Sequence, residues 1–338
     1  MDQLQPAWGE AIVEGSLEWS FIHRTDLVEL AELRAAIEYF DAPVVTRSLD
    51  DLVADFDQPH AHPTHHAVVG RDKGGTIVAY AWNHITPPTQ HRPHVWMEMG
   101  VHPAWRHHHI GLSLVDWSVE RARRWYRHIA ADHDVAPMWV GCAVDEGSRV
   151  ADDIIEAGLL DAQRWFFDGR RGLEDDLPLV IPPVGIELRP YASEMCEEVR
   201  RAHNLAFSTR IGAHDVDAES WQASITRADC RPEWSWIAVR LGEENRVIGY
   251  AINSEIMEPD TGERIGWTER FGVVSGARGL GLGHALLAAS MNSFQEAGCS
   301  GAGIGVDTDQ VNQAERLFGD LGYEFDARMV LFGRSFED

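Results

Sequence analysis

The chain has 338 residues, a length that favours two domains over one. Apolar residues make up 44% of it, as in an ordinary globular protein, and no run of about 18 apolar residues predicts a membrane-spanning helix. The formal net charge of -25 repels nucleic-acid phosphates, so a nucleic acid is not an expected partner. A membrane is not an expected partner either, because a spanning segment is not predicted. An acidic surface suits a cationic amine, although solubility alone is the simpler explanation.

The cysteines lie far apart, at Cys142, Cys196, Cys230 and Cys299, without a C-x-x-C pair. This spacing indicates neither a zinc knuckle nor a redox dithiol, and it is typical of a reducing compartment. The start of the chain lacks the basic residues and apolar block of a secretory signal. We therefore expect a cytoplasmic protein.

The same pattern of elements occurs twice, about 170 residues apart. In the first half we expect strands at 67–70, 77–82, 96–101 and 138–144. In the second half the corresponding strands are expected at 236–239, 247–252, 268–273 and 303–306. In both halves the third strand leads to an arginine, Arg106 or Arg278, and then to a helix with one apolar face.

A proline-rich, acidic segment separates the two halves. We expect an N-terminal domain at 1–176, a linker at 177–184 and a C-terminal domain at 185–338. Strands mixed with helices in this order predict an α/β fold in each half, with a mixed central sheet flanked by helices.

A glycine-rich loop, Arg278-Gly279-Leu280-Gly281-Leu282-Gly283, follows the third strand of the second half. Glycines allow close approach of the backbone to a ligand, and the next helix adds the positive end of its dipole, a combination that suits a pyrophosphate. The loop has neither the spacing of a dinucleotide fingerprint nor the Gly-Lys-Ser/Thr of a P-loop. Glycines that serve only a tight turn are the alternative.

With its neighbours, this loop resembles the V-x-x-x-x-R-G-x-G-x-G cofactor motif of the GNAT superfamily of N-acetyltransferases, with Val273 as its first residue. Ala314, Leu317-Phe318 and Gly322-Tyr323 resemble the late A-x-x-L-Y-x-x-x-G-F helix of that family. The stretch 203–207 is similar to mycothiol-synthase-like tandem members. The resemblance covers about 185–330 well and about 15–170 more loosely, and it implies two tandem GNAT folds.

The resemblance implies a co-substrate, acetyl-CoA or another acyl-CoA. The backbone N–H of Val273 would be the oxyanion donor to the thioester, and Val274 would help to hold the pantetheine arm. The full set of implied cofactor-binding residues is Val273, Val274, Arg278, Gly279, Leu280, Gly281, Leu282, Gly283, His284 and Gln310.

Glu269 is the candidate general base for the attacking amine. It lies four residues before Val273 on the same expected strand, and residues two or four apart on a strand share a face. A solvated carboxylate without a catalytic role is an equally open interpretation. Glu255, on the preceding strand, is the reserve candidate.

The sequence departs from the family pattern in three places. Phe318 stands where the family often has the tyrosine that reprotonates the leaving thiolate, so the general acid is unassigned. Gln310 stands where relatives often have asparagine. The first-half loop, residues 106–111, has His107 and His109 in place of two glycines, so we expect that half to be degenerate.

The implied function is transfer of an acetyl or other short acyl group to a primary amine of a small molecule, by direct attack in a ternary complex. The alternatives are a non-catalytic acyl-CoA-binding scaffold and a protein lysine acetyltransferase. The many histidines form no H-E-x-x-H motif and predict no metal site. A monomer is expected because a tandem repeat mimics a dimer.

Overall fold

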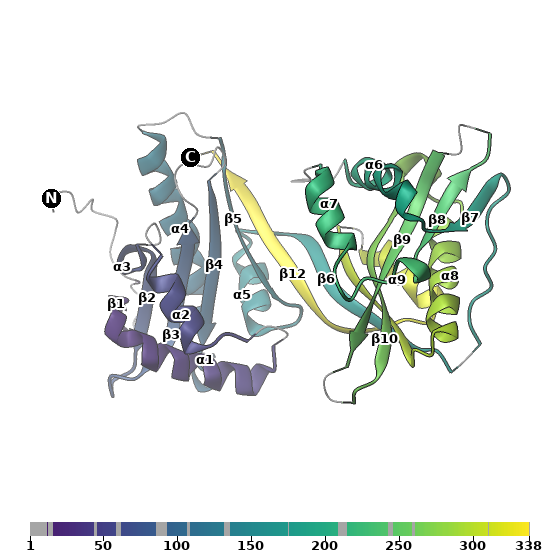
Figure 1. The fold of residues 1–338 in the computed structure, drawn as a ribbon. Coiled ribbons are helices and arrows are strands. Elements are labelled where there is room, and N and C mark those ends of the chain that lie inside the picture. Colours follow the sequence, from purple (N-terminus) through teal and green to yellow (C-terminus); the bar gives the residue numbers. More distant parts are fainter. Residues whose placement is uncertain are drawn as a thin grey trace. The chain divides into compact units, whose positions relative to one another are not determined.

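The structure is a computed structural model. It describes residues 12, 16–43, 46–58, 62–85, 93–106, 109–131, 136–174, 176–208, 215–242, 246–258, 261–309 and 311–337. The chain forms two compact units: unit 1 comprises residues 1–166 with 327–338, and unit 2 comprises 167–326 (Figure 1).

Unit 1 is built on a mixed sheet with helices on both faces. Its strands are β1 (Glu18–Phe21), β2 (Ala67–Arg71), β3 (Ile77–Ile85), β4 (His94–Val101) and β5 (Met138–Asp145). Its helices are α1 (Leu27–Asp41), α2 (Leu49–Phe56), α3 (Pro63–His66), α4 (Ile110–Ala130) and α5 (Arg149–Ala157). The strands up to β4 pair antiparallel, and β4 pairs parallel with β5.

Clusters of buried apolar residues cover both faces of this sheet. On one face α1 contributes Leu27, Leu30 and Leu33, whose spacing places them on one side of the helix against β2 and β3. On the other face α4 contributes Val115 and Val119 against β4 and β5. The spacing of apolar residues in the sequence therefore correctly predicted the buried side of α4.

Unit 2 repeats the arrangement. Its strands are β7 (Ile186–Pro190), β8 (Trp236–Arg240), β9 (Arg246–Met257), β10 (Arg264–Val273) and β11 (Gly301–Thr308), and its helices are α6 (Cys196–Phe207), α7 (Ala218–Ile225), α8 (Leu282–Glu296) and α9 (Val311–Asp320). The pairs β7–β8, β8–β9 and β9–β10 are antiparallel, and β10–β11 is parallel. The helices α6 and α7 pack on one face and α8 on the other. The predicted tandem α/β fold is confirmed.

Each half of the chain ends in a strand that was not predicted from the sequence. The strand β12 (Glu324–Phe336) comes from the end of the chain, yet its residues 329–336 pair antiparallel with β5 in unit 1 (Figure 1). The strand β6 (Asp161–Gly172) comes from the first half, yet from Phe167 onward it belongs to unit 2, beside β11. The two halves thus exchange their last strands, so the compact units differ from the domains expected at 1–176 and 185–338.

Candidate active site

The glycine-rich loop turns from β10 into α8. Gly279 and Gly281 have φ angles of 76° and 81°, the left-handed region in which glycine is strongly preferred. A Cβ added at either residue meets no atom within 4 Å, so both glycines border open space. Within α8 the first N–H to find a helical acceptor is that of Ala285, bonded to the Gly281 oxygen at 3.1 Å. The earlier N–H groups and the helix dipole are therefore available to an anion.

The strand β10 parts from β11 halfway along its length. The parallel pairing runs from Ile265 to Thr268, and beyond it β10 continues to Val273 with β9 as its partner. The N–H of Val274 donates to the Ile248 oxygen at 3.0 Å. Because N–H groups alternate in direction along a strand, the N–H of Val273 is directed to the edge that β11 has left. The role of this N–H as oxyanion donor stays a prediction.

The expectation for Val274 needs correction. The family resemblance implies that Val274 helps to hold the pantetheine arm, which would require a free backbone N–H. That N–H is already donated to β9, so the open edge offers no N–H from Val274.

Arg278 ties the loop to the protein. Its Nε donates to the Val273 oxygen at 3.2 Å, and its Nη2 donates to the Ala206 oxygen at the end of α6, at 2.7 Å. Arg278, one of the expected cofactor-binding residues, therefore makes structural contacts with two backbone carbonyls, and its contact with a cofactor stays a prediction. Through these two hydrogen bonds, Arg278 connects the end of β10 to the end of α6.

The remaining expected loop residues differ in their surroundings. Leu282 is buried, whereas Leu280 is 51% exposed. A Cβ on Gly283 would come within 3.3 Å of Phe271, so this glycine permits close packing of α8 on β10. The Nε2 of His284 lies 3.9 Å from Oδ2 of Asp320, a distance that allows only a weak interaction. Gln310 lies outside the described residues.

Glu269 occupies a β-bulge. The register of β10 against β9 shifts between Thr268 and Arg270, so Glu269 is the extra residue. After the bulge, Val273 packs in the core beside α8, whereas Glu269 contacts Arg227, which follows α7. The bulge breaks the alternation, so the argument that Glu269 and Val273 share a face does not hold. The proximity of Glu269 to the reacting atoms remains a prediction.

The two candidate carboxylates differ in how they are bound. Oε1 of Glu269 accepts from Arg227 at 2.5 Å, and no partner of its Oε2 is found among the described residues. Glu255 uses both oxygens, accepting from Arg231 at 2.6 Å and from Arg264 at 2.5 Å. The hydrogen bond from Arg264 lowers the pKa of Glu255, as does the one from Arg231. Of the two carboxylates, Glu269 is the one that keeps an oxygen without a partner among the described residues, and its role as general base stays a prediction.

The family model described as "Acetyltransferase (GNAT) family" matches residues 29–138 and 196–323, more than half of the chain. The chain belongs to the GNAT family. It is an acyl-CoA-dependent N-acetyltransferase with two GNAT regions.

Curated relatives agree with this assignment, and a solved structure shares the fold. A mycothiol acetyltransferase of Salinispora tropica is 29% identical over 239 residues, which cover 69% of each chain. One of Pseudarthrobacter chlorophenolicus is 30% identical over 169 residues, covering 47% of this chain and 49% of that protein. A GCN5-related N-acetyltransferase from Sphaerobacter thermophilus superposes with a TM-score of 0.58 at 22% identity, covering 95% of this chain and 96% of that one.

The position of the family's tyrosine acid is closed to solvent. Phe318 is 4% exposed and lies in an aromatic cluster with Phe271, Tyr323 and Phe325. Burial raises the pKa of Tyr323, which makes its hydroxyl a weaker acid. None of the described residues of this cluster replaces the missing tyrosine, and the general acid stays unassigned.

Sequence reasoning missed a polar pair beside the splayed strand. The His203 Nδ1 and the hydroxyl of Tyr250 lie 2.6 Å apart. The same hydroxyl would be 2.6 Å from a Cβ on Gly272, so glycine at 272 makes room for it. Tyr80 has the same relation to Gly100 in the first half, so the internal repeat was the available signal for this pair.

The first GNAT unit has a different loop. The guanidinium of Arg106 pairs with both oxygens of Asp41, at 2.7 and 2.6 Å, so its charge is already compensated. His109 takes the place of Gly281 before the helix and has a φ of 57°, a conformation that strains a residue with a side chain. His107 lies outside the described residues. The expectation that this half is degenerate stays a prediction.

Within the described ranges no helix combines the length and the hydropathy that a membrane span requires. No group of three or more side chains suited to a metal ion is found in the same part of the chain.

Proposed function

We propose that unit 2 transfers an acetyl or other short acyl group from acyl-CoA to a primary amine of a small molecule. The open edge of β10, with the Val273 N–H directed into it beside the glycine-rich loop, carries this proposal. The mycothiol acetyltransferases among the relatives favour a small-molecule acceptor over a protein lysine. The reaction would take place in the cytoplasm.

Unit 2 would hold acyl-CoA through the loop and the first turn of α8. Positive φ angles at Gly279 and Gly281 form the concavity for the pyrophosphate. The helix dipole offsets the phosphate charge, which the acidic chain as a whole repels. Arg278 supports this loop through its contacts with Val273 and Ala206.

The reaction would proceed by direct attack. The amine nitrogen forms a bond to the thioester carbon, and the carbonyl oxygen gains a negative charge that the Val273 N–H stabilises. Oε2 of Glu269 takes the proton that the amine loses. The C–S bond then breaks, and the thiolate of CoA takes a proton from water, because Phe318 has none to give. Glu269 returns its proton to the hydroxide that this leaves, so the carboxylate and the water are restored. The products are an N-acylated amine and free CoA.

One observation favours a second candidate function. Phe318 removes the usual proton donor, which suits a scaffold that binds acyl-CoA without turnover. Incubation of the protein with acetyl-CoA and a panel of small amines, with free thiol as the readout, separates the two. We expect amine-dependent thiol release. Binding of acetyl-CoA without release from any amine contradicts the enzymatic proposal and supports the scaffold.

A further inference from the structure

Arg270 lies on the splayed part of β10, on the side of the sheet that α7 covers. The parallel pairing of β10 with β11 ends at Thr268, so Arg270 belongs to the stretch that has lost this neighbour. Its guanidinium carbon is 5.0 Å from the centre of the Trp221 ring on α7. Trp221 is fully buried, whereas Arg270 is partly exposed. The guanidinium group therefore packs against α7 and is within reach of a dissolved ligand.

The proposed reaction gives no role to the charge of Arg270, and the protein does not neutralise it either. In the part of the chain that the structure describes, the guanidinium has a cation–π contact with the indole ring and no hydrogen-bond acceptor or ion-pair partner. Such a contact uses the face of the guanidinium and leaves the N–H groups in its plane available. Carboxylates are present nearby but are already bound, because Arg227 donates to both Asp229 and Glu269.

The repeat places a residue of opposite charge at the same position of unit 1. Glu98 on β4 lies opposite Trp82 of β3, and Arg270 on β10 lies opposite Ile252 of β9. Each is two residues before the glycine that makes room for a tyrosine of the neighbouring strand. Glu98 and Arg270 are therefore equivalent residues of the two GNAT units.

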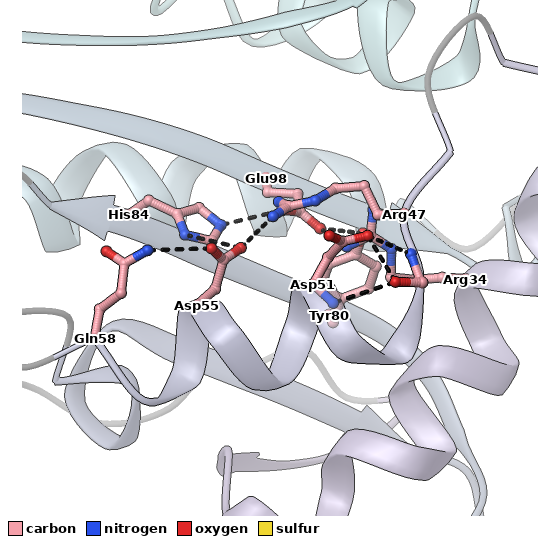
Figure 2. A network of polar contacts seen from close by, with 9 residues as sticks. Arg34, Arg47, Asp51, Asp55, Gln58, Tyr80, His84 and Glu98 are labelled. Atoms are coloured by element: carbon pink, nitrogen blue, oxygen red, sulfur yellow. Dashed lines mark hydrogen bonds and ion pairs between the residues drawn. The ribbon is translucent and has the colours of Figure 1, made fainter.

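In unit 1 the protein itself supplies the partners of this residue. The Oε1 of Glu98 accepts from Arg34 Nη1 at 2.5 Å and from the Tyr80 hydroxyl at 2.9 Å. The Oε2 accepts from Arg47 Nη1 at 3.1 Å and lies 3.1 Å from His84 Nε2 (Figure 2). Unit 2 offers no such set of counter-charges to its arginine among the described residues. A ligand is the remaining source of an acceptor.

The charges beside Arg270 favour a ligand that carries both signs. Arg227 is shared between Asp229 and Glu269, so these three side chains carry one net negative charge, which Arg270 offsets. Glu269 and Arg270 are adjacent in the chain, and both make contacts on the side of the sheet that α7 covers. A purely anionic ligand would be repelled by Glu269. A zwitterion can direct its ammonium group to Glu269 and its carboxylate to Arg270.

Arg270 is also close to the atoms of the proposed reaction. It lies three residues before Val273, which corresponds to roughly 10 Å along the strand. An extended arginine side chain and a small acceptor together cover that span. The Oε2 of Glu269, the proposed proton acceptor, has no partner among the described residues. An acceptor held by Arg270 can therefore bring its amine to both groups.

We propose that the acceptor of unit 2 is an amino acid, whose carboxylate binds the guanidinium of Arg270 and whose amine is acylated. Arg270 is then a specificity-determining residue for a free carboxylate. The ammonium form loses one proton to solvent, the nitrogen attacks the thioester, and the second proton passes to Glu269. The products are an N-acylated amino acid and free CoA. The acylation step rests on the proposed function, whereas binding of the carboxylate does not.

Ligand-observed NMR of the full chain, saturated with CoA, tests the carboxylate site. The probes are the common α-amino acids, β-alanine and γ-aminobutyrate, each compared with its own amide, which lacks the negative charge. We expect saturable binding of at least one amino acid, at least about tenfold tighter than that of its amide.

Arg270→Met tests the guanidinium, because methionine still packs on Trp221 but has no N–H to donate. The ratio of amino-acid to amide affinity should fall to about one in this variant. If this variant does not fold, Arg270→Lys serves, and it should lower the ratio because an ammonium group cannot make two parallel bonds to a carboxylate. Arg201→Met removes an exposed arginine of α6 and should leave the ratio unchanged.

Thiol release from acetyl-CoA with the same probes separates this inference from the proposed function. Binding of an amino acid that depends on Arg270, without thiol release from any amine, supports the carboxylate site and contradicts the proposed function. Thiol release without preference for the carboxylate, or with the same preference in Arg270→Met, overturns the inference. Absence of amino-acid binding overturns it as well. It is also overturned if Arg270→Met weakens binding of succinyl-CoA but not of the amino acid, since the carboxylate would then belong to the acyl group.

Discussion

The Nε of Arg278 donates to the carbonyl oxygen of Val273 at 3.2 Å, and thereby joins the glycine-rich loop to the end of the splayed strand. Unit 1 repeats the contact, because Arg106 Nε donates to the Val101 oxygen at 3.1 Å. The bond persists in the half whose loop has lost glycines. The arginine of the motif therefore maintains the splayed strand, whether or not a phosphate is bound.

Substitution of Arg278 separates this role from charge attraction. Lysine keeps the positive charge but cannot donate to both Val273 and Ala206 in the geometry of a guanidinium. We expect Arg278→Lys and Arg278→Met to weaken acetyl-CoA binding to a similar extent, roughly tenfold, as calorimetry would measure. If the lysine variant binds as the wild type does while the methionine variant fails, charge is the main contribution.

Glu269→Gln tests the proposed base. Glutamine has nearly the same shape but cannot accept the amine proton, so kcat should fall about 100-fold or more with little change in acetyl-CoA binding. Asp229→Asn is the matched control, because Asp229 also pairs with Arg227 but is not assigned a proton. Equal losses of kcat in both variants would show that the Arg227 pairing, rather than proton transfer, matters.

Because Glu98 has a lowered pKa, the free energy of unfolding of unit 1 should decrease as the pH becomes acidic. Burial by itself would raise its pKa, but the hydrogen bond from His84 and the charges of Arg34 and Arg47 outweigh it and hold the pKa at about 2. Its ordinary value is 4.5, so the stabilisation is present above pH 4.5 and is lost as the pH falls towards 2.

The measurement is chemical denaturation of wild type and Glu98→Gln across this range. The advantage of the wild type in unfolding free energy should shrink by about 2 kcal/mol between about pH 6 and pH 3. Glu32→Gln, an exposed change on α1, should show no such trend. A constant difference between wild type and Glu98→Gln over these pH values would contradict the low pKa.

The features that could be predicted from the sequence are those that a local residue pattern determines. Apolar spacing located α4 and α8, and the positions of Gly279 and Gly281 located a turn with positive φ. The bulge at Glu269 was hidden, because a single inserted residue leaves the strand's composition unchanged. The exchange of β6 and β12 was hidden as well, because either last strand has the length and character to pair with β5 or β11.

The hydrogen-bond networks around Arg34 and Tyr250 could not be predicted from the sequence either. Their members lie on α1, β3 and β4 in one unit and on α6 and β9 in the other, so only the tertiary fold brings them together. A charged residue in a strand does not reveal its partners.

The location of the acyl-CoA site is tested most directly by calorimetric titration of acetyl-CoA into wild type, Gly281→Val and Gly276→Val. Valine at 281 would need a φ of 81°, which costs about 1–3 kcal/mol in a residue with a side chain and displaces the loop. At Gly276 a Cβ meets no atom within 4 Å and φ is not positive, so this variant is the control. We predict that Gly281→Val loses acetyl-CoA binding and that Gly276→Val retains it. Wild-type affinity in Gly281→Val would contradict the assignment of the site to unit 2.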